Sequence, residues 1–158
     1  MPMRHEAWEP TRAGEIIAAL AHKEGPMLVI LHALQEAFGY VPEAAVPMVA
    51  QALNLSRAEV HGVVSFYPDF RREPPGRHVL KLCRAEACQA AGGDALAVHA
   101  ETRLGVAFGQ TSADGSVTLE PAYCLGLCAT APAAMLNDRV VGRLDTKRLD
   151  RLMAEAQQ

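Results

Sequence analysis

The chain has 158 residues; half of them are apolar, and 15 Lys and Arg against 18 Asp and Glu give a net charge of −3. A chain of this size folds as one compact domain or as a domain with a smaller lobe, and it has enough apolar residues for a core. The slightly negative charge argues against nucleic acid, since phosphate backbones attract basic proteins. No apolar run approaches the ~20 residues of a membrane span, so direct membrane insertion is not expected.

Helical signals fill residues 1–75. A first helix should follow Thr11, the expected N-cap, and end toward Gly25 and Pro26. Apolar residues then recur at three- and four-residue spacing over 27–38 and are followed by Gly39. This spacing predicts a helix with one buried face that ends at the glycine.

Two further helices complete this part of the chain. One runs to Leu53 and tolerates Pro47 only if the proline lies in its first turn. The other should begin at Ser56, because Ser56 and Glu59 have the pattern of a capping box. Trp8 precedes all four helices and is free either to dock on a partner or to remain untethered. The four short helices predict a small bundle.

A change of composition marks a domain boundary after residue 75. Residues 71–76 contain two prolines and a glycine, which do not continue a helix. Beyond them β-branched residues and glycines become more frequent, as in sheets and their turns. We therefore divide the chain into a helical N-terminal domain, 1–75, and a second domain, 76–158.

The second domain is predicted to be an α/β layer with cysteine loops at one edge. A strand over 78–82 delivers Cys83 to its carboxyl end, where loops of open sheets commonly carry function. Asp114 and Gly115 form a strong hairpin signal, and Asn137 and Asp138 a second one. The other expected elements are helices at 94–104 and 146–156 and strands at 106–111, 117–120, 134–136 and 139–141.

All four cysteines lie in two short loops of this domain. Cys83 and Cys88 enclose Arg-Ala-Glu-Ala, and after 35 residues Cys124 and Cys128 enclose Leu-Gly-Leu. Four thiolates that converge on one point suit a metal or a cluster. Two irons bridged by two sulfides need two terminal thiolates each, which two loops with a pair apiece can supply. We interpret the four residues as the ligands of one [2Fe-2S] cluster.

Three other interpretations of the cysteines compete with this one. Disulfides would fit a secreted protein, but the first residues lack the basic and apolar regions of a secretory signal. Free thiols in this number fit a reducing compartment, so we expect a cytoplasmic protein. Structural zinc also takes four thiolates and stays open, although its loops most often use a two-residue spacer that neither pair has. A redox dithiol would need Cys-x-x-Cys, which is absent.

Other residues near the cysteines leave alternatives open. Gly126 either aims backbone amides at sulfur, which would shift the cluster potential, or only permits a turn. Arg84 and Glu86 either tune the cluster or contact a partner, or they form a solvated loop pair. No nucleotide-binding or acyl-transfer motif occurs, so a complete enzyme has no support in the sequence. The six histidines lack metal spacing and are expected on the surface or in satisfied core positions: His5, His22, His32, His61, His78 and His99.

The cysteine pattern resembles the thioredoxin-like [2Fe-2S] subunit family. The resemblance rests on Cys83-x4-Cys88 and on the run from Cys124 through Gly126 and Cys128 to Ala131-Pro132. Gly-Tyr-Val-Pro at 39–42 and Ser-Phe-Tyr at 65–67 extend it over most of the chain. This family includes the small peripheral iron-sulfur subunit of respiratory complex I, its counterpart in NAD-linked hydrogenases, and the gamma subunit of NAD-dependent formate dehydrogenases. It implies a thioredoxin-like [2Fe-2S] domain after the helical segment, with all four cysteines as ligands.

Within the family, the first cysteine loop is most similar to the formate dehydrogenase gamma branch. That similarity implies a non-catalytic electron-transfer subunit that exchanges single electrons with a flavin- and Fe-S-containing NADH-binding subunit. Because a carrier must approach its donor closely, the exposed faces of the helical domain, 1–75, are expected to dock on that subunit. FMN, further Fe-S clusters and the molybdenum cofactor of a formate-oxidising subunit would then lie on partners only. The alternatives are the equivalent subunit of complex I or of a hydrogenase, a zinc-stabilised adaptor, and a stand-alone thioredoxin-like ferredoxin.

Overall fold

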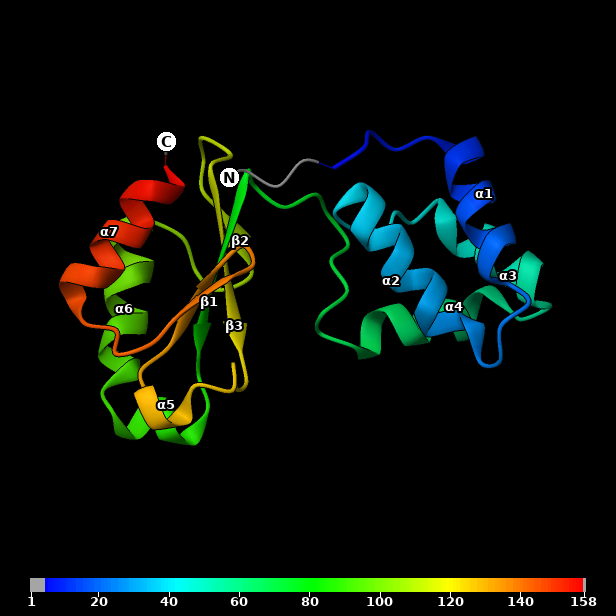
Figure 1. Cartoon of the computed structure of the whole chain (residues 1–158). Coiled ribbons are helices and arrows are strands. Elements are labelled where there is room, and N and C mark those ends of the chain that lie inside the picture. The colour runs from blue at the N-terminus through cyan, green and yellow to red at the C-terminus, as the bar shows by residue number, and fades with distance from the viewer. Residues whose placement is uncertain (1–4, 158) are drawn as a thin grey trace. The chain divides into compact units, whose positions relative to one another are not determined.

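The computed structural model describes residues 5–157, which fold into two compact units (Figure 1). The first unit is His5–Pro74, and the second begins at Pro75. Each has its own buried apolar core. Among the described residues, no helix is both long and apolar enough to cross a membrane.

The first unit is built from four helices: α1 (Pro10–Leu20), α2 (Pro26–Phe38), α3 (Ala45–Leu53) and α4 (Arg57–Phe66). The fully buried side chains include Ile30, Leu31 and Leu34, on the face of α2 that the spacing predicted. Val49 of α3 and Val60 of α4 are buried as well. Removal of these faces from water is the main force that holds such short helices together, because short helices are marginal by themselves.

Local signals in three of these helices lie where they were predicted. Gly39 ends α2 in the left-handed conformation at φ 84°, which glycine adopts without strain. Pro47 lies in the first turn of α3, where no intrahelical N–H is needed. The Ser56 hydroxyl accepts from the Glu59 amide, and the Glu59 carboxylate accepts from the Ser56 amide. The capping box of α4 is therefore confirmed.

Two expectations for the N-terminal end are wrong. Thr11 is not the N-cap of α1, because the helix begins at Pro10 and the Glu9 carboxylate accepts from the amides of Thr11 and Arg12. Trp8 is not part of an untethered tail, since its ring packs edge-on against Phe38 with centroids 5.1 Å apart. The first correction involves a cap residue outside the commonest set. The second involves a contact between residues that lie far apart in the sequence.

The second unit is a five-stranded mixed sheet with helices packed on it. The strands are β1 (His78–Cys83), β2 (Gln110–Thr111), β3 (Val117–Ala122), β4 (Ala134–Leu136) and β5 (Arg139–Val141), in the order β2-β3-β1-β4-β5. The central strand β1 runs parallel to β3 and antiparallel to β4. Helices α6 (Gly93–Leu104) and α7 (Thr146–Ala156) lie together beside the sheet (Figure 1). The α/β class is confirmed.

Some boundaries differ from the expected ones. The strand expected at 106–111 is reduced to β2, because the Gly109 amide donates to the Leu119 carbonyl and the Gln110 side chain accepts from the Ala107 amide in a turn. Two short helices were not predicted: α5 (Glu86–Ala90) and the 3-10 turn η1 (Cys128–Thr130). Each of them contains a cysteine, so both form part of the cysteine loops.

Candidate metal centre

Two parallel strands deliver the cysteine loops to one end of the sheet. Cys83 is the last residue of β1 and is paired in register with Ala122, the last residue of β3. Cys88 lies in α5, just after β1, and Cys124 comes two residues after β3. The parallel pairing therefore brings together two loops that are 35 residues apart in the sequence.

The four thiols differ sharply in exposure. Cys83 and Cys88 are 4% and 2% exposed, whereas Cys124 and Cys128 are exposed. Ala133 is buried with the first pair, and partly buried apolar residues pack around it: Ala85, Leu125, Leu127 and Ala131. The centre thus has one dry side and one side open to solvent.

The exposed pair already has the spacing of two ligands on one metal. The Sγ atoms of Cys124 and Cys128 lie 3.6 Å apart. Tetrahedral metal–sulfur bonds of about 2.3 Å would separate two ligand sulfurs by about 3.8 Å. The Gly126 amide donates to Cys124 Sγ at 3.4 Å, and Gly126 has φ 76°. Gly126 therefore both turns the chain and directs an amide at sulfur; its effect on the cluster potential stays a prediction.

The buried pair is shaped by burial and by amide donors. Burial raises the pKa of the Cys83 thiol, but hydrogen bonds from the Ala85, Cys124 and Leu125 amides and from Cys88 outweigh it, so the pKa is lowered overall. For Cys88, burial and the hydrogen bond with Cys83 raise the pKa. One sulfur of the buried pair is thus prepared to carry negative charge.

The two pairs also interact with each other. Amides of the second loop, at Cys124 and Leu125, donate to the Cys83 sulfur of the first loop. The pKa of Cys128 is raised by its contact with Cys124 and also by the negative charge of Cys83. The thiols of the two loops therefore influence one another electrostatically; that all four bind one cluster stays a prediction.

The donor set fits a [2Fe-2S] cluster. The sulfurs are arranged as two pairs: Cys124 lies next to Cys128, and Cys83 and Cys88 share a hydrogen bond. Four free thiols in an apolar setting with amide donors match the ligation of a [2Fe-2S] cluster. Cys83, Cys88, Cys124 and Cys128 would hold the cluster, which supplies one-electron chemistry.

Several histidines have structural partners. His78 is buried, and its Nδ1 lies 2.9 Å from the Asn137 amide nitrogen. His99 Nε2 lies 2.7 Å from an Asp150 carboxylate oxygen and joins α6 to α7. His32 packs at a tilt against Phe70, with ring centroids 4.9 Å apart. These contacts are the satisfied positions expected for such residues.

Sequence reasoning missed two features of the site. Tyr123, directly before Cys124, is 73% exposed. It belongs to a stretch, residues 121–137, without a single Asp, Glu, Lys, Arg or His, and this lack of charge is the signal that could have revealed an apolar rim. The side chain of Arg84 folds away from solvent onto Phe108 and Asp94, which no local pattern indicates.

Comparison with known proteins identifies the family. Residues 13–157 match the model of the thioredoxin-like [2Fe-2S] ferredoxin family. The chain is 36% identical to a subunit of the NADH-quinone oxidoreductase of Pseudomonas aeruginosa, over 84% of this chain and 81% of that protein. It is 34% identical to the HndA subunit of the NADP-reducing hydrogenase of Solidesulfovibrio fructosivorans, over 89% and 82% of the two chains.

A solved structure agrees with the sequence matches. The crystal structure of an NAD⁺-reducing [NiFe]-hydrogenase in the air-oxidised state is similar to 80% of this chain, with a TM-score of 0.67 and 31% identity. The chain spans only 22% of that longer hydrogenase chain. The protein is thus an iron-sulfur protein of α/β architecture. It belongs to the thioredoxin-like [2Fe-2S] ferredoxin family, whose members carry one [2Fe-2S] cluster.

Proposed function

We propose that the chain is the [2Fe-2S] electron-transfer component of a cytoplasmic NAD-linked oxidoreductase and exchanges single electrons with a flavin- and Fe-S-containing NADH-binding subunit. The observation that carries the proposal is the pairing of a buried and an exposed set of thiols at the shared end of β1 and β3. The names of the relatives support the class, since they are subunits of NADH-quinone oxidoreductases and of hydrogenases that reduce nicotinamide cofactors.

The residues of the chain have separate tasks at this centre. The four cysteine sulfurs bind the cluster, and the amides of Ala85, Leu125 and Gly126 stabilise negative charge on sulfur. Leu125 and Leu127 help to keep water from the buried pair. The exposed pair provides the side on which a redox partner approaches, because a carrier must come close to its donor.

The rim around the exposed pair suits a lasting contact rather than a brief encounter. Tyr123 and the uncharged stretch 121–137 present no ionised side chain to steer a diffusing carrier. Exposed aromatic side chains are frequent anchors of protein interfaces. We infer that this rim lies against the flavin subunit, which favours a resident subunit over a stand-alone ferredoxin.

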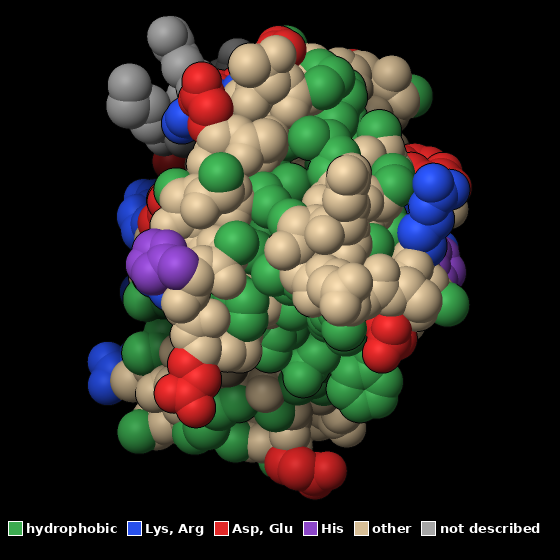
Figure 2. All heavy atoms as spheres, turned by 90° about the vertical axis from the view of Figure 1, so that its right-hand side faces the viewer, with side chains coloured by type: hydrophobic (Ala, Val, Ile, Leu, Met, Phe, Trp, Pro, Cys, Tyr) green, Lys and Arg blue, Asp and Glu red, His purple; other side chains and the backbone are tan. Residues whose placement is uncertain are grey.

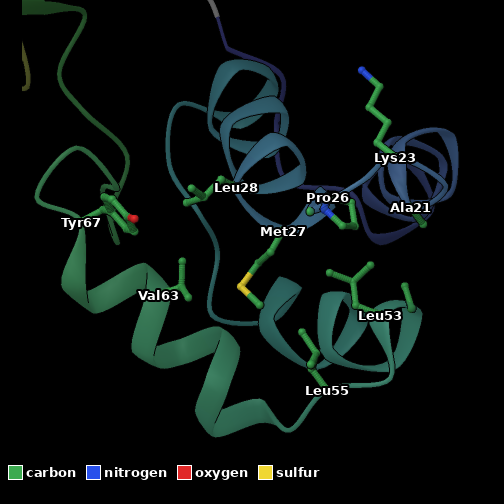
Figure 3. Close-up of a pocket in the computed structure, with 11 residues that line it drawn as sticks. Ala21, Lys23, Pro26, Met27, Leu28, Leu53, Leu55, Val63 and Tyr67 are labelled. Carbon is green, nitrogen blue, oxygen red and sulfur yellow. The ribbon is translucent and has the colours of Figure 1, made fainter.

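The helical unit offers a second contact surface for the same partner. Figure 2 shows apolar side chains gathered over a face of this unit. A groove of about 570 Å³ lies between α2, α4 and the end of α3, where Met27 points toward Val63 and Leu55 (Figure 3). Phe66 is 76% exposed and lines a second, adjoining pocket that shares Met27, Leu55 and Val63 with the groove. We infer that the unit docks there on the flavin subunit.

Within this function, we propose assembly in an NAD-dependent formate dehydrogenase with a molybdenum-containing catalytic subunit. The support is the first cysteine loop, Cys83-Arg-Ala-Glu-Ala-Cys88 followed by Gln89, which resembles the gamma branch of the family. The alternative assemblies are the types named for the relatives, NADH-quinone oxidoreductase and NAD(P)-reducing hydrogenase.

Metal content and spectroscopy test the cluster. Protein purified without oxygen is expected to hold two irons per chain and to show a rhombic electron paramagnetic resonance (EPR) signal of one unpaired electron only after reduction with dithionite. A colourless protein with one zinc, still silent after reconstitution with iron and sulfide, would establish the zinc adaptor instead.

The assembly is tested by purifying the complex through a tag on this chain from its own cells. Molybdenum in the complex and formate-dependent reduction of NAD⁺ are expected. Nickel with hydrogen-dependent reduction would establish a hydrogenase, and a membrane complex that reduces quinone with NADH would establish the complex I type.

A further inference from the structure

The Arg84 side chain connects the first cysteine loop to the rest of its unit. Arg84 follows Cys83 directly, yet its side chain is only 31% exposed. Its Nη2 lies 3.1 Å from Oδ1 of Asp94 in the first turn of α6, and its Cζ lies 5.1 Å from the centroid of the Phe108 ring. Phe108 in turn packs against the apolar core of the unit. The side chain therefore joins the loop to α6 and to the core.

The backbone of Arg84 holds both cysteine loops. Its amide donates to the carbonyl of Ala122, two residues before Cys124, at 2.7 Å. Its carbonyl accepts from the side chain of Gln89, the residue after Cys88, at 2.7 Å. Movement of Arg84 would thus displace the backbone near three of the four ligands: Cys83, Cys88 and Cys124.

The start of α6 approaches the same loop closely. A Cβ atom at Gly93 would lie 2.6 Å from the carbonyl oxygen of Cys88, so only glycine fits there. The neighbouring residue, Asp94, forms the ion pair with Arg84. The loop between Cys83 and Cys88 is therefore held against α6 at both of its ends.

The contribution of the Arg84–Asp94 ion pair to folding stability does not by itself account for this arrangement. Asp94 is 60% exposed, and ion pairs of that kind add little. The Nε atom of Arg84 is buried without a hydrogen-bond partner, which is unfavourable. A planar guanidinium can lie on an aromatic ring and pair with a carboxylate at once, whereas a lysine ammonium cannot do both in this way.

We propose that Arg84 is a positioning residue for the cluster: by packing on Phe108 and pairing with Asp94, it fixes the loop that carries the buried ligands Cys83 and Cys88. This inference rests on the proposed [2Fe-2S] function. A fixed loop holds the two sulfurs in one geometry and keeps water from the buried side, so the geometry and lifetime of the cluster depend on the guanidinium and not only on its charge.

Three variants separate position from charge. Arg84→Lys keeps the charge and can keep the ion pair, but loses the planar contact with the ring. Phe108→Leu keeps the arginine and an apolar neighbour, but removes the ring. Arg84→Gln removes the charge as well. Arg103→Gln is the control, because it removes an equal charge from the last turn of the same helix, α6, away from the loop.

The measurements are made on the whole chain with its cluster. We expect Arg84→Lys and Phe108→Leu to broaden the EPR signal of the reduced cluster and to release iron to a chelator about fivefold faster, as for the loss of one aromatic–cation contact. Arg84→Gln should do the same and also lower the midpoint potential, because a positive charge favours the reduced cluster. Arg103→Gln should match the wild type.

Two results would overturn the positioning role. One is Arg84→Lys and Phe108→Leu with wild-type EPR signals and iron release. The other is a changed potential in Arg84→Gln alone, which would leave only an effect of charge. If a variant at 84 or 108 fails to fold by circular dichroism, Asp94→Asn, at an exposed position, is tested by the same criteria. A wild-type chain without a [2Fe-2S] signal would instead contradict the proposed function itself.

Discussion

Gly126 shows how one residue shapes the second cysteine loop. With φ 76° it occupies the left-handed region that side-chain-bearing residues avoid, and its amide donates to Cys124 Sγ. A Cβ atom there would meet open space, so only the backbone conformation opposes a substitution. The position therefore separates conformational strain from steric crowding.

Gly126→Ala is expected to destabilise the second unit by about 1 kcal/mol, because alanine is strained in the left-handed region, and to speed cluster loss. Thermal unfolding and iron release would measure the two effects. Gly62→Ala in α4 is the matched control, since it also meets open space but has no left-handed φ; it should stabilise the chain slightly. Equal behaviour of the two variants would show that the turn does not need glycine.

His78 couples the stability of the second unit to pH. Burial lowers the pKa of this histidine, with a smaller contribution from Arg77. The unfolded chain then binds a proton near the ordinary pKa of about 6.5, while the folded chain resists it. The free energy of unfolding should therefore fall as the pH drops below about 6.5. Above that pH the contribution of neutral His78 to stability is fully present.

The comparison of wild type with His78→Gln tests this coupling. Denaturant unfolding at pH 7.5 and at pH 5.5 should show a larger loss of stability for the wild type than for the variant, which cannot titrate at this position. Titratable groups elsewhere in the chain are the same in both proteins, so their contributions cancel in the comparison. Parallel pH profiles would contradict the role of His78.

At the scale of the element, α4 depends on the capping box at its start. The Ser56 hydroxyl and the Glu59 carboxylate satisfy each other's amides, and these hydrogen bonds lower the pKa of Glu59. A carboxyl group whose pKa is lowered by folding stabilises the folded chain at pH values above its ordinary pKa. The contribution of Glu59 to folding stability should therefore be lost as the pH falls into the acidic range below about 4.

Ser56→Ala should cost about 1 kcal/mol in the stability of the helical unit, because a helix amide loses its acceptor. Urea unfolding followed by circular dichroism would measure the change. Ser65→Ala is the control within α4: Ser65 donates to the Gly62 carbonyl of its own helix, and its loss should be nearly neutral. A cap variant as stable as this control would mean that α4 is held by tertiary packing alone.

The elements also show which predictions depended on local patterns. The α2 face, the capping box and the hairpin at Asn137 were predicted because spacing and turn chemistry involve neighbouring residues. The shortened strand β2 and the helix α5 were missed, because their hydrogen bonds depend on a distant strand and on the packing of the first cysteine loop. The Glu9 cap was missed because glutamate is not among the preferred cap residues.

At the scale of the whole molecule, the apolar groove of the helical unit is proposed to be covered by the flavin subunit. Phe66→Asp should weaken association with that subunit tenfold or more, as expected when an aromatic anchor worth about 2 kcal/mol is lost. The affinity of the whole chain for the purified partner, measured by calorimetry, would show the change.

The matched control is Val98→Asp on α6, another exposed apolar residue, but on the second unit. This variant should bind like the wild type, and both variants should retain their cluster signal. If Phe66→Asp also binds with unchanged affinity, the helical unit does not dock through this groove.

The sequence by itself determined the order of segments along the chain, a helical segment followed by an α/β segment. It also determined that four cysteines lie in two loops with the spacing of a [2Fe-2S] family. These features follow from spacing, turns and caps, which act between residues close in the chain. Tertiary structure alone decided which thiols are buried, that amides of Cys124 and Leu125 reach Cys83, and that Arg84 folds onto Phe108. The physical reason is that burial and hydrogen bonding between the two loops exist only after β1 and β3 pair, so no local pattern encodes them.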